Sequence, residues 1–510
     1  MSDEWTIGGR STNALRVLFT HYTVTIDSNS SGPFEVRPSS ISGSVPINPY
    51  ERIDDRFQVT DNVSLFVPRG NGFHHLKAGA NIGALPVTLK SGRFARGGFF
   101  FETDLPFDPA TPTTFPSLGI VGSAFVTDRT SWQLGAYASD DWTISPRLTL
   151  NLGVRYEIET KALNEDVPNP VPYFDRPALD VNNWSPRLGL AYSIREGMVA
   201  RAGYGRYAGH LFTWLSDGRQ RPPTLRFTEN PDYRGFRNPN GSDVSSAQSI
   251  TGTDPRIEVP QNDEFSVGID RQLLHEWAVA IDYVGMRGHD EVLEVETNAP
   301  DAVTGRRPHP EFGPVPAFAS IGRSDYDGLQ VSLRSRDRGR YSFGIAYSLS
   351  RSRNDHNYYW DVIPGDTTLA GDYGPALNDQ RHRLVLNGTS RLPWRFSASG
   401  ILTLGTAQPF NINSGVADEE GVFQRPLGVG RNAGRGDSYS RLDLRLWRTF
   451  AVKAAKIEAI AEIYNLFNTT NADPDTIVQN ILSPQFGSGG STPHPLYIAR
   501  QAQVGMRVTF

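Results

Sequence analysis

Side chains that often do chemistry in proteins occur as four short clusters in this 510-residue chain. Two contain histidine, His74-His75 and Asp355-His356, and two are acidic, Asp140-Asp141 and Glu419-Glu420. Histidine and carboxylate groups can ligate a metal ion, and paired carboxylates can act as general acid and base. Neither histidine cluster has helical or cysteine partners at metal-ligand spacing, so we interpret both as loop histidines. The acidic clusters lie in or beside expected turns without an acid/base partner, which indicates solvated carboxylates.

Motifs for nucleophilic catalysis and phosphate binding are missing from the sequence. The chain contains no cysteine, which excludes thiol nucleophiles, disulfides and cysteine-ligated zinc. No Gly-x-Ser-x-Gly or phosphate-loop pattern stands on an expected strand-to-helix turn. We therefore predict no catalytic residues, no metal site and no cofactor, and we expect that the chain is not an enzyme.

Composition narrows the class of protein further. With 50 Lys and Arg against 55 Asp and Glu, the chain lacks the basic excess of a nucleic-acid-binding protein. A mean hydropathy of -0.40 and the lack of a long apolar run exclude transmembrane helices. Membrane-spanning β-strands stay possible, because only every second residue of such a strand meets lipid. The 49 glycines and 11% aromatic residues favour sheets and turns.

The last residues of the chain have the pattern of such a strand. Residues 503–510 alternate polar and apolar, with Val504, Met506, Val508 and Phe510 on one face. A strand between lipid and a wet lumen requires this alternation. The terminal Phe510 resembles the signal that the barrel-assembly machinery reads, although a soluble β protein can also end on an edge strand.

Similar alternating runs recur in pairs along the chain, and each pair is joined by a short turn. The paired runs occupy about 131–158, 185–208, 265–283, 329–349, 384–406 and 442–463, and weaker runs lie at about 13–26, 56–67, 72–83 and 97–104. They predict an all-β fold, an antiparallel transmembrane outer-membrane β-barrel with roughly 16 to 18 strands in this chain.

Long polar connections separate these pairs, at about 160–182, 209–262, 289–325, 353–380, 407–438 and 468–496. Counting back from Phe510 at the periplasmic end, every long connection is extracellular and every short turn is periplasmic. Outer-membrane barrels have this asymmetry, whereas a soluble sandwich has no reason for it.

Polar residues of the expected strands face the lumen, where they could touch a plug or a substrate, and a hydrated barrel wall is their default role. They are Arg155, Asp270, Asp282, Arg334, Asp443, Arg445, Glu458 and Glu462. The most ligand-like segment is Asn357-Tyr358-Tyr359-Trp360-Asp361, because exposed aromatic residues beside polar groups often serve recognition. A loop that packs over the barrel mouth explains that segment equally well, so we assign no ligand-binding residues.

Several segments resemble one family of outer-membrane proteins. Residues 462–469, which contain Asn465-Leu466-Phe467-Asn468, resemble the N-L-F-N stretch near the end of TonB-dependent receptor barrels. Three further segments resemble the Oar-like branch of that family, namely 263–273 with 281–288, 326–333 and 378–383. The resemblance is strong over 131–510 and weaker over 1–130. It implies that residues 1–510 are a TonB-dependent receptor β-barrel domain.

The N-terminal region departs from this family. Residues 1–5 are acidic and lack the basic and apolar regions of a secretory signal peptide. No TonB box, plug or regulatory-like domain is found, and the strands are fewer than the about 22 of plugged transporters. We therefore expect an N-terminally truncated barrel whose signal peptide, plug and remaining strands lie upstream. Such a barrel would be an open pore, and without a TonB box it could not receive energy from the inner membrane.

Three functions agree with the sequence. The first is the barrel of a TonB-dependent receptor in the cell outer membrane that takes up a bulky nutrient with energy from the inner membrane. Its expected partners are outer-membrane lipid, the barrel-assembly machinery through Phe510, the TonB system through the missing plug region, and an unknown bulky substrate, but no nucleic acid. The second is a passive pore or adhesin on the same barrel, and the third is a soluble secreted β-sandwich protein.

Overall fold

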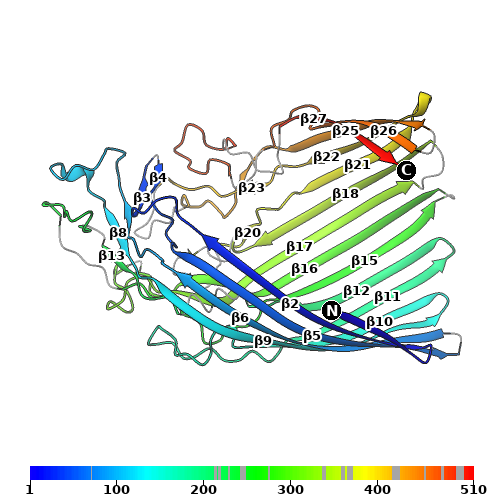
Figure 1. The fold of residues 1–510 in the computed structure, drawn as a ribbon, viewed down its shortest axis with the longest axis horizontal. Helices are drawn as coiled ribbons and strands as arrows, with labels where there is room; N and C mark the ends of the chain where they lie inside the picture. The colour runs from blue at the N-terminus through cyan, green and yellow to red at the C-terminus, as the bar shows by residue number, and fades with distance from the viewer. Residues whose placement is uncertain are drawn as a thin grey trace.

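Most of the chain forms one long antiparallel sheet that is rolled into a barrel wall (Figure 1). The computed structural model describes all residues except 39, 71, 212–214, 216–219, 228–229, 242–247, 274–275, 302, 336–339, 358–361, 364–371, 416–424, 453–454, 472–475 and 490–498. The strands run side by side with a common tilt, the long connections gather at one end, and the short turns lie at the other (Figure 1). This asymmetry agrees with the arrangement of long and short connections in the sequence.

Within the described residues this sheet contains 20 strands. Three of them are strands of only two residues that pair with longer strands of the sheet, namely β14 (Gly252–Thr253), β19 (Val362–Ile363) and β20 (Gly374–Pro375). The other 17 form the wall, within the predicted range, and are β1 (Ser2–Ile7), β2 (Ser11–Ile26), β5 (Tyr50–Arg69), β6 (Gly72–Ser91), β9 (Phe125–Ser145), β10 (Leu148–Thr160), β11 (Trp184–Arg195), β12 (Met198–Ala208), β15 (Gln261–Leu273), β16 (Trp277–Glu296), β17 (Pro316–Ser335), β18 (Tyr341–Asn354), β21 (His382–Arg391), β22 (Phe396–Gly405), β25 (Tyr439–Val452), β26 (Ala455–Tyr464) and β27 (Gln501–Thr509).

Each wall strand pairs with its neighbours in the chain order of the wall, and the wall has two edges. β1 pairs with β2, and β27 pairs with β26. Among the described residues no ladder joins β1 to β27. The outer edges of these strands therefore carry backbone N–H and C=O groups without a sheet partner, which is costly in a lipid environment.

The two faces of the wall differ in chemistry. In β25, Leu444 and Leu446 are 39% and 42% exposed on one face. Arg445 lies between them and points to the opposite face, where its Nη1 is 3.4 Å from Oε1 of Glu462 in β26. Since successive side chains of a strand point to opposite sides, the apolar residues line the outer surface and the charged residues line the lumen. No helix among the described residues is long and apolar enough to cross a membrane.

The long connections form a second, smaller sheet outside the wall. Five short strands make a second sheet in the order β13 (Leu225–Phe227), β8 (Leu118–Val121), β7 (Gly98–Phe100), β3 (Phe34–Arg37) and β4 (Ser40–Ser42). We call this sheet and its loops the cap. The sequence run at 97–104 was expected to be a wall strand, and this prediction is wrong, because only Gly98–Phe100 forms a strand and it belongs to the cap. Phe99 and Phe101 are buried there, 7% and 6% exposed, instead of facing lipid.

The expected connection at 289–325 is also shorter than predicted. β16 continues to Glu296 and β17 begins at Pro316, so the two strands extend well past the short-turn half of the wall. Their pairing shifts register between Gly288 and Glu291, and beyond this bulge Leu293 is fully buried. The bulge interrupts the alternation in the sequence, and beyond it consecutive residues such as Val292 and Leu293 are both buried, so that both faces of the strands are covered there.

The separation of the two faces gives a mutational test. Replacing Leu444 by Arg places a charge on the lipid face and should cost about 2–4 kcal/mol near the bilayer midplane, whereas Arg445→Leu on the lumen face should be mild. The fraction of folded chain, measured by heat-modifiable migration after refolding into lipid vesicles, should therefore fall far more for Leu444→Arg. Equal losses for the two variants would contradict the assignment of the faces.

The side on which the long connections lie gives a second test. Asn240 is exposed in the connection between β13 and β14, on the long-loop side of the barrel. An epitope tag inserted at Asn240 should bind antibody on intact cells, and a tag at the turn Glu196-Gly197 should bind only after permeabilisation. The reverse pattern would show that the barrel has the opposite orientation. We also expect a tag at Asp366, in the 353–380 connection, to be accessible on intact cells; this residue lies outside the described residues.

Candidate functional site

Ion pairs within strands and between strands line the lumen. Arg155 in β10 donates to Glu157 at 2.6 Å and to Asn81 of β6 at 2.9 Å. Most of the polar residues expected to face the lumen take part in such contacts: Arg201 lies 2.9 Å from Asp270 and 3.1 Å from Asp282, Arg441 2.8 Å from Asp443, Arg445 3.4 Å from Glu462, and Arg507 3.5 Å from Glu458. Opposite charges at neighbouring positions of a sheet attract each other, so many charged side chains can lie close together on this face of the wall.

A hollow of about 530 Å³ lies in this wall, on the lumen side of β9 to β16. Its floor contains Gly153, Gly189 and Gly203 of three successive strands, with Gly189 directly opposite Gly203. A Cβ atom at Gly189 would lie 3.2 Å from the Cβ of Asn151, so the floor is lower than the wall around it. The volume is in the range of small-molecule sites. We did not predict this hollow from the sequence. The sequence feature that could have indicated it is the presence of glycine at lumen-facing positions of successive strands.

Two of the four clusters from the sequence meet in the wall, and the prediction that they lie in loops or turns is wrong. His74 and His75 belong to β6, and Asp140 and Asp141 belong to the adjacent β9. Nδ1 of His74 is 2.7 Å from Oδ2 of Asp140, and the His74 ring stacks on Trp142 with centroids 5.0 Å apart. Long-range strand pairing brings these residues together, which short sequence windows could not reveal.

Strand alternation sends the second histidine to the opposite face, into the lumen. Nε2 of His75 is 2.7 Å from Oγ of Ser64 in β5, and Nδ1 of His75 is 3.9 Å from Oδ2 of Asp141. The same Asp141 oxygen accepts a hydrogen bond of 2.8 Å from Nζ of Lys77. Ser64, His75, Lys77 and Asp141 thus form one polar cluster, and Asp141 also lines the hollow.

The third cluster, Asp355-His356, is also not a solvated loop pair. Nδ1 of His356 is 3.0 Å from Asp355, and Nε2 is 3.4 Å from Glu291 of β16. Asp355 is 1% exposed and accepts the backbone N–H of Arg323 in β17. These contacts fasten the end of β18 to its neighbours. The described residues contain no group of three or more His, Asp or Glu side chains placed to hold a metal ion. Glu419-Glu420 lies outside the described residues.

The ligand-like segment 357–361 is described only at Asn357. The Oδ1 atom of Asn357 accepts a hydrogen bond of 2.7 Å from Nδ2 of Asn432, which is fully buried. Nδ2 of Asn432 also donates to the carbonyl oxygen of Pro375 at 2.8 Å. These bonds tie the connection after β18 to the connection after β22. Tyr358-Tyr359-Trp360-Asp361 lies outside the described residues.

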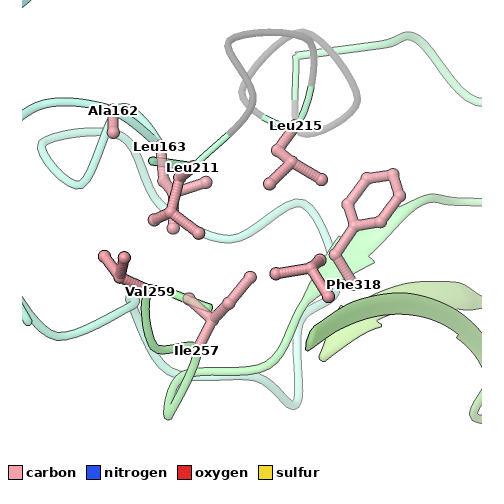
Figure 2. Close-up of a cluster of buried hydrophobic side chains, with 8 residues drawn as sticks. Ala162, Leu163, Leu211, Leu215, Ile257, Val259 and Phe318 are labelled. Atoms are coloured by element: carbon pink, nitrogen blue, oxygen red, sulfur yellow. The ribbon is translucent and has the colours of Figure 1, made fainter. Parts of the chain in front are cut away.

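An apolar core holds the connections together at the mouth of the barrel (Figure 2). Leu163 follows β10, Leu211 and Leu215 follow β12, and Ile257 and Val259 precede β15; they form one cluster with Phe318 of β17, which lies at its edge (Figure 2). Leu215 and Phe318 are fully buried. The mouth is therefore lined by a packed layer of loops, so that access to the lumen depends on how these loops are arranged.

The cap has a second core of aromatic rings. Tyr233 is fully buried, and its ring makes edge contacts with Phe99 and Phe101 at centroid distances of 4.8 Å and 5.3 Å. Its hydroxyl donates to Oε1 of Glu35 at 2.6 Å, and Arg234 lies 3.0 Å from the same oxygen. Burial, with the adjacent Glu35 carboxylate, raises the pKa of Tyr233. The hydrogen bond satisfies a buried polar group and fixes the loop that carries Tyr233 to β3.

Comparison with known families agrees with this architecture. The family described as "Outer membrane beta barrel domain" matches residues 7–176 and 176–430. The chain belongs to this outer-membrane β-barrel family. It is therefore a protein of the cell outer membrane, and the prediction of an all-β transmembrane barrel in that membrane is confirmed.

Relatives of this barrel are named as transporters and receptors. The TonB-dependent transporter Oar of Myxococcus xanthus is 22% identical over 419 residues, which are 73% of this chain and 37% of the relative. The outer membrane transporter YddB of Escherichia coli has a TM-score of 0.63 at 14% identity, and covers 99% of this chain. The pyoverdine receptor FpvA of Pseudomonas aeruginosa has a TM-score of 0.59 at 12% identity, and covers all of this chain. The chain spans 61% and 60% of these two structures. The resemblance to TonB-dependent receptor barrels is confirmed.

A histidine in the mouth predicts a pH-dependent loop. His210 follows β12, and its Nδ1 is 3.5 Å from Oε2 of the buried Glu159. Glu159 raises the pKa of His210, and burial opposes this effect. Because the pKa of His210 is higher in the folded state, the His210–Glu159 pair stabilises the loop at pH values below the unfolded pKa of about 6.5. This stability is lost as the pH rises through the folded pKa of His210. Protection of the Gly209 amide against hydrogen exchange should therefore decrease as pH rises through that range.

The control for this prediction removes the carboxylate. The Gly209 amide donates to the carbonyl oxygen of Pro260 at 2.7 Å, so its protection reports on the loop. In Glu159→Gln the pH dependence of the protection factor should largely disappear. An unchanged pH dependence in that variant would show that another group controls the loop.

Proposed function

We propose that this chain is the barrel of a TonB-dependent receptor that takes up a bulky nutrient across the outer membrane. The observation that carries the proposal is the superposition of nearly the whole chain on barrels named as outer-membrane transporters and siderophore receptors. The polar lumen, the hollow in its wall and the packed loops at its mouth supply a hydrated path with a structured entrance. Transport through a barrel requires both features.

Energy for this uptake is proposed to come from the inner membrane. The relative Oar is named a TonB-dependent transporter, and this chain covers 37% of its length. We propose that coupling to the TonB system passes through a plug region. The barrel would then contribute the wall and the loops, and the plug would contribute the energy-dependent step.

The C-terminal strand is proposed to direct assembly. β27 is exposed along its whole length, with Val504 at 88% and Met506 at 71%. Phe510 follows β27 and is 99% exposed. An accessible alternating strand that ends in an aromatic residue is what a strand-pairing assembly machine could capture, because its backbone edge and its apolar face are both available.

An uptake measurement tests the proposed function. The chain is joined to a plug-bearing N-terminal region of an Oar-like receptor and a cleavable export signal, and is expressed in cells that lack their own siderophore receptors. Ferric pyoverdine and a set of other ferric siderophores serve as probes, because structural neighbours are receptors for such compounds. Uptake of at least one probe should occur and should stop when an uncoupler collapses the proton-motive force.

The matched control is the Leu444→Arg variant in the same fusion, which should not reach the membrane and should show only background uptake. Uptake by the unsubstituted fusion that continues after the uncoupler is added would favour the passive pore. A folded barrel that takes up no probe would reject siderophores as the substrate class. Uptake with equal rates in the control would contradict the proposal.

A further inference from the structure

The cluster of Ser64, His75 and Asp141 on the lumen wall places a hydroxyl, an imidazole and a carboxylate in the order of a nucleophile, a general base and a positioning carboxylate, with a hydrogen bond between the first two. Oγ of Ser64 and Nε2 of His75 are 2.7 Å apart, which is hydrogen-bonding distance. The other ring nitrogen, Nδ1, faces Oδ2 of Asp141 at 3.9 Å. A serine hydroxyl becomes nucleophilic when a base within about 2.6–3.2 Å accepts its proton, and a third group orients the base. This arrangement is recognised by its geometry and not by its order in the sequence.

Three adjacent strands hold this cluster in place. His75 of β6 is directly opposite Asp141 of β9, and Lys77 of β6 is directly opposite Ser64 of β5. Sites built on paired strands are held more precisely than sites built on loops. Nζ of Lys77 donates to Asp141 at 2.8 Å, which keeps the carboxylate beside the imidazole. With its proton on Nδ1, toward Asp141, the neutral imidazole presents the Nε2 lone pair to Ser64.

A hydrogen-bond donor for a developing oxyanion lies beside the nucleophile. Asn62 is two residues before Ser64 in β5 and therefore on the same face. Oδ1 of Asn62 accepts the hydroxyl of Tyr137 at 2.8 Å, which fixes the orientation of the amide group. The Nδ2 group of Asn62 would be the donor to the oxyanion in the reaction proposed below. Side-chain amides serve as oxyanion donors in acyl transfer.

The hollow gives this cluster a place for a substrate. Asp141 lines the hollow of about 530 Å³, and Ser139 beside it is directly opposite Lys77. Neighbouring strands are about 4.8 Å apart, so Ser64 lies roughly 10 Å from the hollow's edge strand. A small molecule held at the Asp141 and Ser139 edge of the hollow, and not on its glycine floor, would therefore be the one within reach of Ser64. The polar walls and the small volume favour a small polar ester over a long acyl chain.

We propose that Ser64 is an activated nucleophile and that this lumen site hydrolyses small acyl esters. Oγ of Ser64 attacks the ester carbonyl carbon while its proton passes to Nε2 of His75, and the oxyanion forms beside Asn62. The C–O bond to the alcohol breaks, and the leaving oxygen takes the proton from Nε2. Water then attacks the acyl-serine, gives a proton to Nε2 and releases the acid, and the proton returns to Oγ. Ester and water become acid and alcohol. This activity adds to transport and does not depend on it.

The test uses the full 510-residue chain folded in detergent, with p-nitrophenyl acetate as the substrate and a fluorophosphonate as the covalent probe. The chain should hydrolyse the ester and should carry one label, which mass spectrometry should place on Ser64. Ser64→Ala and His75→Ala should each lower the rate by about 10²–10⁴-fold, the usual contribution of general acid–base catalysis. Ser332→Ala, on the lumen face of β17 away from the hollow, is the matched control and should keep the full rate.

A separate comparison tests Asp141 as a positioning residue. Asp141→Asn should lower the rate and shift the pH profile, and Asp141→Glu should restore part of the rate, whereas a merely structural role would give equal effects. Heat-modifiable migration shows whether each variant is folded. No label, a label on another residue, or an unchanged rate in folded Ser64→Ala would overturn the proposal. Label mapping on the unsubstituted chain decides the proposal even if a variant fails to fold.

Discussion

Pairing of backbone N–H and C=O groups between neighbouring strands is the constraint on which the rest of this structure depends. Lipid cannot hydrogen-bond these groups, so a chain that crosses the membrane as strands must satisfy them within the sheet. The ladder from β1 to β27 does so for all wall strands except at its two outer edges. Because pairing fixes the strand direction and register, it also fixes which side chains face lipid and which face water.

Alternation along the strands gives adjacent residues opposite surroundings. His74 stacks on Trp142 on the outer surface, while its neighbour His75 contacts Ser64 in the lumen. A shift of β6 by one residue would exchange these two histidines and would place Lys77 in lipid. The charged residues of the lumen therefore help to fix the strand register, as the apolar residues of the outer surface do. Moving either set of side chains to the opposite face would cost free energy.

Much of the wall could be predicted from the sequence, because alternation is a local signal and each run carries it independently. The contents of the lumen could be predicted only in part. Arg155 and Asp282 were expected to face the lumen, but the cluster of Ser64, His75 and Asp141 depends on the exact register of the β5–β6 hairpin and on the pairing of β6 with β9, which is distant in the chain. The cap was missed for the same reason. Residues near Phe99 look like a strand in isolation, and only their burial against Tyr233 assigns them to the cap.

The apolar cores of this protein lie at the long-loop end of the barrel, where connections pack on each other and on the extended ends of β16 and β17. The outer face of the wall is covered by lipid and its inner face is polar, so large side chains are fully buried mainly where connections pack on each other, as Leu215 and Tyr233 show. Leu215 and Tyr233 lie outside the ladder, so substitutions of these two residues are expected to change the loops at the mouth and not the strand pairing that holds the barrel. Substitutions in the wall act on the ladder or on the lumen surface. Selectivity at the entrance and chemistry in the lumen can therefore change independently, because different interactions stabilise the parts of the structure that carry them.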